Sequence, residues 1–269
     1  MIKICTIDLD GTLFDKEKNI SKENIEAIKE ARKNGCKIVV ATGRPISGVT
    51  HVLEALELTT NDDYVICYNG AKVLNCGTKE TVFELTITGS DVKKIYQYVK
   101  ENNLNYHAFR NNGELICNRQ NPYTDVECRI NKVIAYDYDF DTVNDDDLFL
   151  KAMIVDDFDF LNNLTKGIDP YFYTTYTMVR SSRIFLEFLN KKVDKGLALE
   201  NLAKYLNVSM DETMAIGDAE NDLSMIKRAK IGVAMANAFP EVLAECDFVT
   251  LSNEESGVAY AINKFVNGK

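Results

Sequence analysis

The sequence predicts an α/β fold, namely a Rossmann-like parallel sheet core with helices on both faces and an inserted α+β cap domain. Three observations support this prediction. Short apolar runs alternate with amphipathic helical patterns over residues 1–82, and the same alternation returns over residues 190–269. Residues 83–189 instead mix helices with hairpin-like strands. Continuously apolar strands joined by helices are typical of a parallel sheet covered on both faces.

The first part of the core contains three predicted strands, at 2–7, 36–41 and 64–68, each ending in polar residues. Ser21 is the predicted N-cap of the helix between the first two, and Gly35 ends that helix. Pro45 opens a second helix with an apolar stripe that reaches Leu56. The last part gives a helix over 194–206, strands at 213–216, 231–234 and 248–251, a helix near 239–244 and a final helix.

The middle of the chain, residues 83–189, is predicted to be a separate lobe. An amphipathic helix carries Val92, Ile95 and Val99 on one face, and a hairpin turns at 111–113. A strand over 149–155 and a helix over 158–164 follow. Two β-rich runs, 171–179 and 184–189, are joined by a predicted tight turn at Ser181 and Ser182. We therefore assign 1–82 and 190–269 to the α/β core and 83–189 to the inserted cap.

Composition narrows the function. The chain has 269 residues and a formal net charge of −10, without a basic block that would neutralise a nucleic-acid backbone. We see no apolar run of membrane-spanning length and no charged-then-apolar leader, so nucleic acid and membrane are not expected partners and a cytoplasmic location is expected. An acidic protein repels an anionic substrate, which favours a bound metal cation in the site.

Cysteine and histidine show no pattern typical of a metal site or a catalytic triad. Seven cysteines occur without any C-x-x-C pair, and they are predicted to be reduced core residues. With only two histidines, a zinc site or a histidine-based triad is improbable. The chemistry must therefore depend on Asp, Lys, Thr and Asn.

The first strand ends at Asp8-Leu9-Asp10-Gly11-Thr12, which sets two carboxylates two residues apart. Open α/β folds bind ligands at the carboxyl edge of the sheet, where one carboxylate could attack while the other handles a proton. Asp, Gly and Thr are also common turn residues, so this string alone is equally compatible with a structural turn.

Polar residues follow three other strands of the core and sit at the start of one helix. They are Thr42-Gly43-Arg44, Asn69-Gly70, Asp218 with Asn221 and Asp222, and Lys195. In a parallel sheet these strand ends share one edge, and together they supply a nucleophile, a proton donor, a hydroxyl, an ammonium and metal carboxylates. Asn69 and Gly70 form either a turn or a substrate contact. Arg44 contacts either the substrate or structural carboxylates.

The chain resembles the haloacid dehalogenase superfamily and, within it, the Cof-type subgroup of sugar-phosphatase-like hydrolases. Four motifs in order carry the resemblance: Asp8-Leu9-Asp10-Gly11-Thr12, Ala41-Thr42-Gly43-Arg44, Lys195-Gly196 and Gly217-Asp218-Ala219-Glu220-Asn221-Asp222. The resemblance spans the whole chain, including an α/β cap between the second and third motifs.

This resemblance implies a role for each residue. Asp8 would attack phosphorus, and Asp10 would protonate the leaving group and then activate water. Mg²⁺ would be held by Asp8, Asp218 and the main-chain carbonyl of Asp10. Asp222 would orient metal-bound waters or Lys195. The residues implied to bind the phosphoryl oxygens are Leu9, Thr42, Gly43, Lys195 and Asn221.

The expected function is a Mg²⁺-dependent phosphatase acting on a small phosphorylated metabolite, a sugar phosphate or similar phosphomonoester, through an aspartyl phosphate. Arg44, Asn69 and Gly70 are candidate substrate contacts. A phosphomutase and a catalytically silent phosphometabolite-binding protein are the alternatives. A dehalogenase is disfavoured because it has no use for Asp10 or a metal, and a phospho-acceptor signalling domain is disfavoured by Asp10 and by the inserted residues 83–189.

Overall fold

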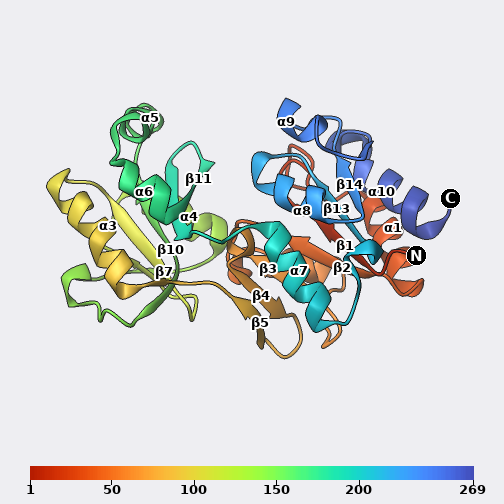
Figure 1. Ribbon diagram of the computed structural model, residues 1–269, viewed down its shortest axis with the longest axis horizontal. Coiled ribbons are helices and arrows are strands. Elements are labelled where there is room, and N and C mark those ends of the chain that lie inside the picture. The colour runs from red at the N-terminus through yellow and green to blue at the C-terminus, as the bar shows by residue number, and fades with distance from the viewer. The chain divides into compact units, whose positions relative to one another are not determined.

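The computed structural model describes residues 1–269, which form two compact units (Figure 1). The first unit comprises 1–43, 50–84 and 194–269, and the second comprises 44–49 and 85–193. The units divide at 84/85 and 193/194, close to the boundaries drawn from the sequence at 82/83 and 189/190. The assignment of 44–49 to the second unit has no counterpart in the sequence-based division.

An eight-stranded sheet organises the first unit, in the order β15-β14-β13-β1-β2-β3-β4-β5. The pairs from β15 to β3 are parallel, whereas β4 and β5 add an antiparallel edge that the sequence analysis missed. The strands are β1 (Ile4–Ile7), β2 (Lys37–Ala41), β3 (Tyr64–Cys67), β4 (Lys72–Asn75), β5 (Thr81–Glu84), β13 (Thr213–Gly217), β14 (Ile231–Ala234) and β15 (Phe248–Val249).

Helices cover this sheet on both faces, as the sequence predicted. They are α1 (Lys22–Lys33), α2 (Thr50–Ala55), α7 (Lys195–Tyr205), α8 (Leu223–Arg228), α9 (Pro240–Leu243) and α10 (Gly257–Ile262). Alternate strand residues such as Val39 and Ile66 pack in one cluster with Leu199 and Leu202 of α7. The intervening strand residues point to the opposite face because side chains alternate along a strand. Helices α1 and α10 lie side by side, joined by a hydrogen bond from Ala259 N to Asn24 Oδ1 (2.8 Å, Figure 1).

The helix predicted after Pro45 is interrupted. A 3₁₀ turn spans Ile46–Gly48, and α2 begins only at Thr50. Residues 44–49 belong to the second unit, where a Cβ on Gly48 would lie 2.4 Å from Asn131 Oδ1. The break therefore falls where the chain passes from one unit to the other, and the single helix predicted over this stretch was wrong.

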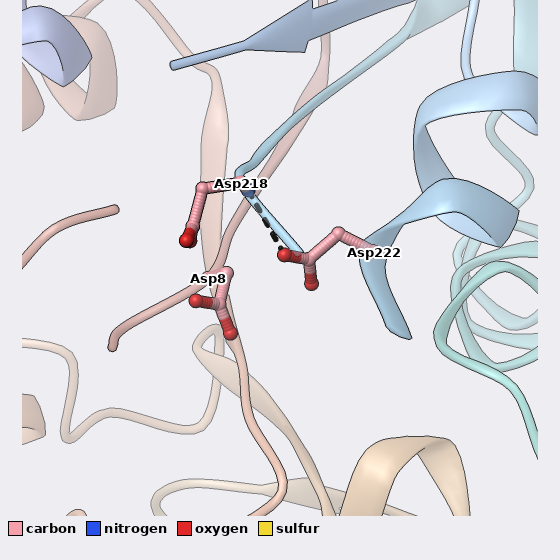
Figure 2. Close-up of side chains that lie close together, drawn as sticks. All are labelled: Asp8, Asp218 and Asp222. Atoms are coloured by element: carbon pink, nitrogen blue, oxygen red, sulfur yellow. Dashed lines mark hydrogen bonds between the residues drawn. The ribbon is translucent and has the colours of Figure 1, made fainter. Parts of the chain in front are cut away.

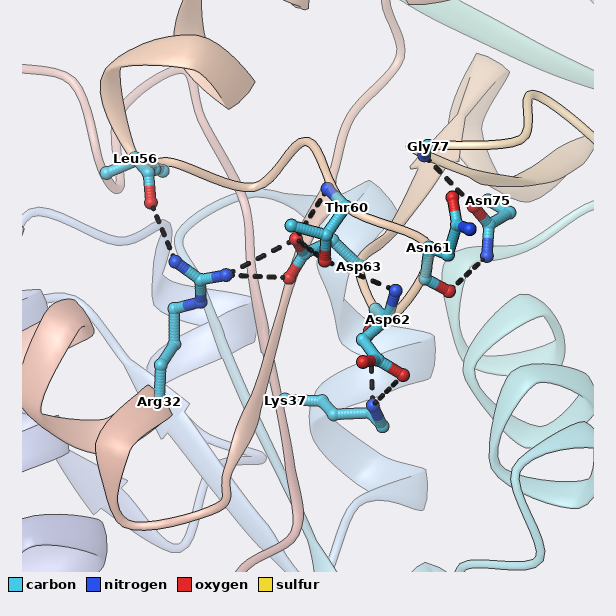
Figure 3. Close-up of polar contacts among 9 residues, drawn as sticks. All are labelled: Arg32, Lys37, Leu56, Thr60, Asn61, Asp62, Asp63, Asn75 and Gly77. Atoms are coloured by element: carbon cyan, nitrogen blue, oxygen red, sulfur yellow. Dashed lines mark hydrogen bonds and ion pairs between the residues drawn. The ribbon is translucent and has the colours of Figure 1, made fainter.

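A polar cluster ties α1 to the loop before β3 (Figure 3). Arg32 donates to both carboxylate oxygens of Asp63 (3.1 and 3.3 Å) and to the carbonyl of Leu56 (3.4 Å). The main-chain N and the hydroxyl of Thr60 donate to the same carboxylate (2.9 and 2.7 Å). Asp63 is buried, whereas the neighbouring Asp62 side chain is 92% exposed and pairs with Lys37 at 3.8 Å. The cluster thus satisfies a buried charge with several donors.

A seven-stranded, mainly antiparallel sheet organises the second unit, in the order β11-β12-β10-β7-β8-β9 with β6 beside β10. Its strands are β6 (Ile87–Thr88), β7 (Tyr106–Arg110), β8 (Leu115–Cys117), β9 (Ala135–Asp137), β10 (Leu148–Val155), β11 (Tyr176–Ser182) and β12 (Phe185–Asn190). Its helices are α3 (Gly89–Glu101), α4 (Pro122–Asn131), α5 (Phe158–Gly167) and α6 (Pro170–Thr175). Apolar residues of α3, α5 and α6 form one core cluster with alternate residues of the sheet.

Two predictions for this unit were wrong. Residues 170–175 form helix α6 and are not part of a β-rich run, because Asp169 caps the Tyr171 N–H and Pro170 opens the helix. The turn between β11 and β12 lies at Arg183 and Ile184, two residues beyond the predicted serine pair. Helix α4 and strand β9 were not predicted at all.

The sheet of the second unit also carries buried charges. Lys151 on β10 lies 2.7 Å from Glu187 on β12 and 3.8 Å from Glu127 on α4. All three side chains are at most 3% exposed. Alternation puts Lys151 and Glu187 on the face opposite the apolar core cluster. No helix in the protein has the length and apolar character needed to cross a membrane.

Candidate active site

The parallel register brings the predicted strand ends to one edge of the first sheet. Ile7, the last residue of β1, pairs with Ile216 on β13 and with Val40 on β2. Asp8 therefore emerges between the residues that follow those two strands. Its main-chain N donates to the carbonyl of Ile216 (3.0 Å), which fixes Asp8 beside the loop that carries Asp218.

Three carboxylates converge at this edge, those of Asp8, Asp218 and Asp222 (Figure 2). One oxygen from each lies within 4.8 Å of the other two, and all three side chains are buried. The Lys195 ammonium donates to Asp8 Oδ1 and to Asp222 Oδ1, both at 2.6 Å. Residues from both ends of the sequence thus form a single charged cluster.

Lys195 occupies an unusual position for a cation. It is the first residue of α7 and is fully buried, although a helix N-terminus disfavours positive charge. Gly196 allows α7 to approach α8 closely, because a Cβ there would lie 2.3 Å from the Ser224 carbonyl oxygen. A buried cation at a helix N-terminus contradicts the usual local preferences, and such exceptions are characteristic of functional positions. The carboxylates, rather than the helix, hold this ammonium.

Asp222 uses its carboxylate entirely within the protein. Its Oδ2 accepts from the main-chain N of Asp218 (3.0 Å, Figure 2). The same oxygen accepts from the main-chain N of Ala219 (3.1 Å), and Oδ1 accepts from Lys195. A Cβ on Gly217 would lie 2.5 Å from the Asp222 side chain, so only glycine fits there. Asp222 therefore orders the loop and Lys195, which leaves Asp8 and Asp218 as the carboxylates able to take a cation.

The charges in the cluster do not balance. Burial, and next to it repulsion from Asp222, raises the pKa of Asp8 well above its usual value, and Lys195 offsets only part of this. Burial raises the pKa of Asp218 to about 6, against a hydrogen bond from Thr12 that lowers it. When all three carboxylates are ionised, they exceed the single ammonium by two negative charges, and their oxygens are hard ligands. The donor set therefore fits a divalent cation such as Mg²⁺.

Two neighbours of Asp218 were not among the predicted site residues. The Thr12 hydroxyl donates to Asp218 Oδ1 (2.7 Å). Gly11 has φ +91°, and a Cβ there would lie 2.4 Å from Asp218 Oδ2. Both residues belong to the Asp-Leu-Asp-Gly-Thr string, so the motif could have marked them as site residues. Their contact with Asp218, however, is visible only in the folded chain.

Asp10 lies apart from this cluster of carboxylates. Its side chain is 42% exposed and accepts a hydrogen bond from Lys18 (2.7 Å), which the sequence analysis did not single out. Leu9 between the two aspartates is buried, and its carbonyl accepts from Thr12 N (3.3 Å) and Phe14 N (2.9 Å). The turn after β1 thus sends Asp8 inward and Asp10 toward solvent.

The remaining predicted residues of the first unit surround β2 and β3. Thr42 is buried, and its carbonyl accepts from Asn69 N (3.0 Å). Asn221 donates from Nδ2 to Asn69 Oδ1 (3.1 Å), and a Cβ on Gly43 would lie 3.0 Å from the same oxygen. Gly70 lies against the carbonyl of Asp194, the residue before Lys195.

Arg44 is the one predicted site residue in the second unit. There its charge lowers the pKa of Glu127 on α4, in opposition to burial, which is the largest influence and raises it. Contact between Arg44 and a substrate stays a prediction.

Comparison with known proteins assigns the family. The family profile of haloacid dehalogenase-like hydrolases matches residues 5–262. YxeH of Bacillus subtilis (strain 168), which bears a provisional name as a phosphatase, is 40% identical over 100% of both chains. A second B. subtilis protein, the 5-amino-6-(5-phospho-D-ribitylamino)uracil phosphatase YcsE, is 28% identical over 98% of this chain and 96% of its own.

A solved structure agrees with these sequences. A haloacid dehalogenase-like hydrolase from Bacteroides thetaiotaomicron superposes with a TM-score of 0.87 at 31% identity, covering 98% of this chain and 99% of that one. The fold, the motifs and these likenesses lead to one conclusion. This chain belongs to the haloacid dehalogenase-like hydrolases and is a phosphatase of that family.

Proposed function

We propose that the protein is a Mg²⁺-dependent phosphatase that hydrolyses a small phosphorylated metabolite through an aspartyl phosphate on Asp8. The observation that carries the proposal is the buried cluster in which Lys195 joins Asp8 to Asp222 while Asp218 lies beside them. A buried carboxylate with both an ammonium and a cation site next to it is equipped to approach a phosphate dianion.

The proposed metal ligands are the carboxylates of Asp8 and Asp218 and the main-chain carbonyl of Asp10. When bound, the cation would neutralise negative charge between Asp8 and the substrate phosphate. Gly11 and Thr12 hold Asp218 in place for this role, since one leaves room for its carboxylate and the other donates to it. Asp222 keeps Lys195 and the loop in position.

In the first proposed step, an oxygen of Asp8 attacks phosphorus and the bond to the leaving oxygen breaks. Asp10 donates its proton to that oxygen, so the leaving group departs as an alcohol. The Thr42 hydroxyl, the Leu9 and Gly43 N–H groups, the Asn221 amide and the Lys195 ammonium hold the three phosphoryl oxygens. Asp10 faces solvent and pairs with Lys18, so it can carry the proton only once that ion pair has opened.

In the second step, Asp10 takes a proton from a water molecule that attacks phosphorus of the aspartyl phosphate. Asp8 is released as a carboxylate and inorganic phosphate leaves. The proton that Asp10 takes from water replaces the one it gave to the leaving oxygen, so Asp10 ends the cycle in its starting form.

Asp10→Asn separates these steps. With p-nitrophenyl phosphate the leaving group needs no proton, so Asp8 should still be phosphorylated while hydrolysis of the intermediate stalls. We expect a burst of about one equivalent of p-nitrophenol, and a phosphorylated peptide containing Asp8 in the mass spectrum. Asp8→Asn should give neither. A burst without a modified Asp8, or full turnover by Asp8→Asn, would contradict the mechanism.

For the substrate, we propose a sugar phosphate or a related polyol phosphate, bound with the second unit acting as a cap that sets specificity. The similarity to YcsE, whose name gives a phosphoribityl compound as its substrate, supports this class. Phosphate release should be measured across sugar phosphates, polyol phosphates and nucleotides. Preference for nucleotides, or isomerisation of a sugar phosphate without phosphate release, would reject the proposal.

A cytoplasmic location is also proposed, in keeping with seven free cysteines.

A further inference from the structure

The chain takes an unusual path directly after β3. Tyr68, Asn69 and Gly70 have φ values of 52°, 56° and 101°, three consecutive residues in the left-handed region. This region is uncommon for residues other than glycine, because the Cβ crowds the backbone. Such conformations persist where the surrounding structure fixes them, and they cluster at functional sites.

Two contacts of the main chain fix this turn. Asn69 N donates to the carbonyl of Thr42 (3.0 Å), which joins the turn to the end of β2. A Cβ on Gly70 would lie 2.3 Å from the carbonyl oxygen of Asp194 and 3.0 Å from Lys195 N. The turn therefore lies against both the Thr42-Gly43 segment and the start of α7.

The side chain of Asn69 connects a third segment. Its Oδ1 accepts from Asn221 Nδ2 (3.1 Å), a residue 152 positions later that follows β13 on the other side of β1. The Asn69 amide also fills the space over Gly43, where a Cβ would lie 3.0 Å from Oδ1 and 3.1 Å from Nδ2. Asn69 itself is only 5% exposed, whereas Gly43 and Asn221 are partly exposed, so the buried amide supports two segments that solvent or a ligand can reach.

The hydrogen-bond capacity of Asn221 shows what this contact does. An amide nitrogen has two N–H groups, and here one is given to Asn69. The second N–H, in the plane of the same amide, has its direction set by the first bond. An Asn221 amide held in this way presents one donor in a fixed orientation.

We propose that Asn69 is a positioning residue of the phosphate site, holding the Asn221 amide and the Gly43 segment in register rather than contacting the substrate. The inference rests on the proposed function, in which Asn221 and Gly43 bind phosphoryl oxygens. The left-handed turn is the device that brings the Asn69 amide over Gly43 and within reach of Asn221.

Asn69→Gly tests this, because glycine adopts the same φ without strain and only the amide is lost. The matched control is Asn207→Gly, since Asn207 has φ 53° and is exposed in the loop after α7. Binding of inorganic phosphate in the presence of Mg²⁺ and turnover of p-nitrophenyl phosphate are measured for both. We expect Asn69→Gly to weaken phosphate binding and raise KM about tenfold, with the control unchanged.

Coupling to Asn221 distinguishes positioning from a general loss of structure. Asn221→Ala should cause a similar loss, and Asn69→Gly should add little in that background. Gly43→Ala should weaken phosphate binding in the wild type and much less in Asn69→Gly, where the space is free. Losses that multiply in the double variant, or an Asn69→Gly variant no worse than Asn207→Gly, would overturn the inference while leaving a functional phosphatase. A wild type that neither binds phosphate nor turns over would overturn the proposed function as well.

Discussion

Replacement of Lys195 by Met tests how the buried carboxylates are held. Lys195 is fully buried and lies 2.6 Å from both Asp8 and Asp222. Burial opposes its charged form, but attraction from Asp222 and Asp8 outweighs burial and raises its pKa. Removing one partner from a buried ion pair costs about 3–5 kcal/mol, because the remaining charge is uncompensated. We therefore expect Lys195→Met to lose about 3 kcal/mol or more at pH 8 without metal.

The stability lost in Lys195→Met should depend on pH, and the pKa values of the carboxylates determine whether the loss grows or shrinks as pH rises. Lys195 lowers the pKa of Asp8 and of Asp218, so its removal raises both further above their unfolded values. The folded variant then binds more protons than the unfolded chain, and its stability falls as pH rises. The stability defect should therefore be largest at pH 8 and much smaller at pH 5, where protons neutralise the cluster.

Urea unfolding in EDTA at pH 5 and pH 8, followed by circular dichroism, measures this difference. Lys204→Met is the control, because Lys204 lies exposed in the last turn of the same helix and should matter little. Mg²⁺ should restore part of the stability lost at pH 8, since a divalent cation compensates the same carboxylates. Equal losses at both pH values, or a loss no larger than in Lys204→Met, would refute the reasoning.

Three further outcomes are expected. Mg²⁺ affinity, measured by calorimetry, should fall about tenfold or more between pH 7.5 and 5, because Asp218 with a pKa of about 6 must lose its proton to bind metal; a flat profile would exclude Asp218 as a ligand. Asp63→Ala should cost about 1–3 kcal/mol in urea unfolding, because it removes the buried carboxylate that accepts from Arg32 and Thr60, whereas Asp62→Ala should have little effect. Lys151→Met should destabilise the second unit by about 3 kcal/mol, because it removes the ammonium that neutralises the buried Glu187 carboxylate, and unchanged hydrogen exchange there would contradict this.

Local sequence patterns predicted most of the elements well. The capped helix after Ser21, the helix starting after Asp194 and the apolar strands all lie within a few residues of their predicted bounds. These features depend on neighbours in sequence, such as a serine that caps its own helix. Errors arose at 170–175, where an aspartate and a proline start a helix inside an aromatic run, and at the antiparallel strands β4 and β5. Short aromatic or apolar runs are compatible with either helix or strand.

For the candidate site, too, the sequence pattern predicted some features and only the tertiary structure decided others. Residue types and spacing predicted that Asp8 and Asp218 share one edge, because the ends of parallel strands meet there, and the family resemblance supported Lys195 as their neighbour. Tertiary structure alone decided what each contacts: the Thr12 hydroxyl and the space over Gly11 hold Asp218, and Asn69 holds Asn221. Pairwise hydrogen bonds depend on side-chain direction and on distances across many residues of intervening chain, which no local pattern records. The sequence by itself therefore determined the chemistry available at this edge, and the fold determined its geometry.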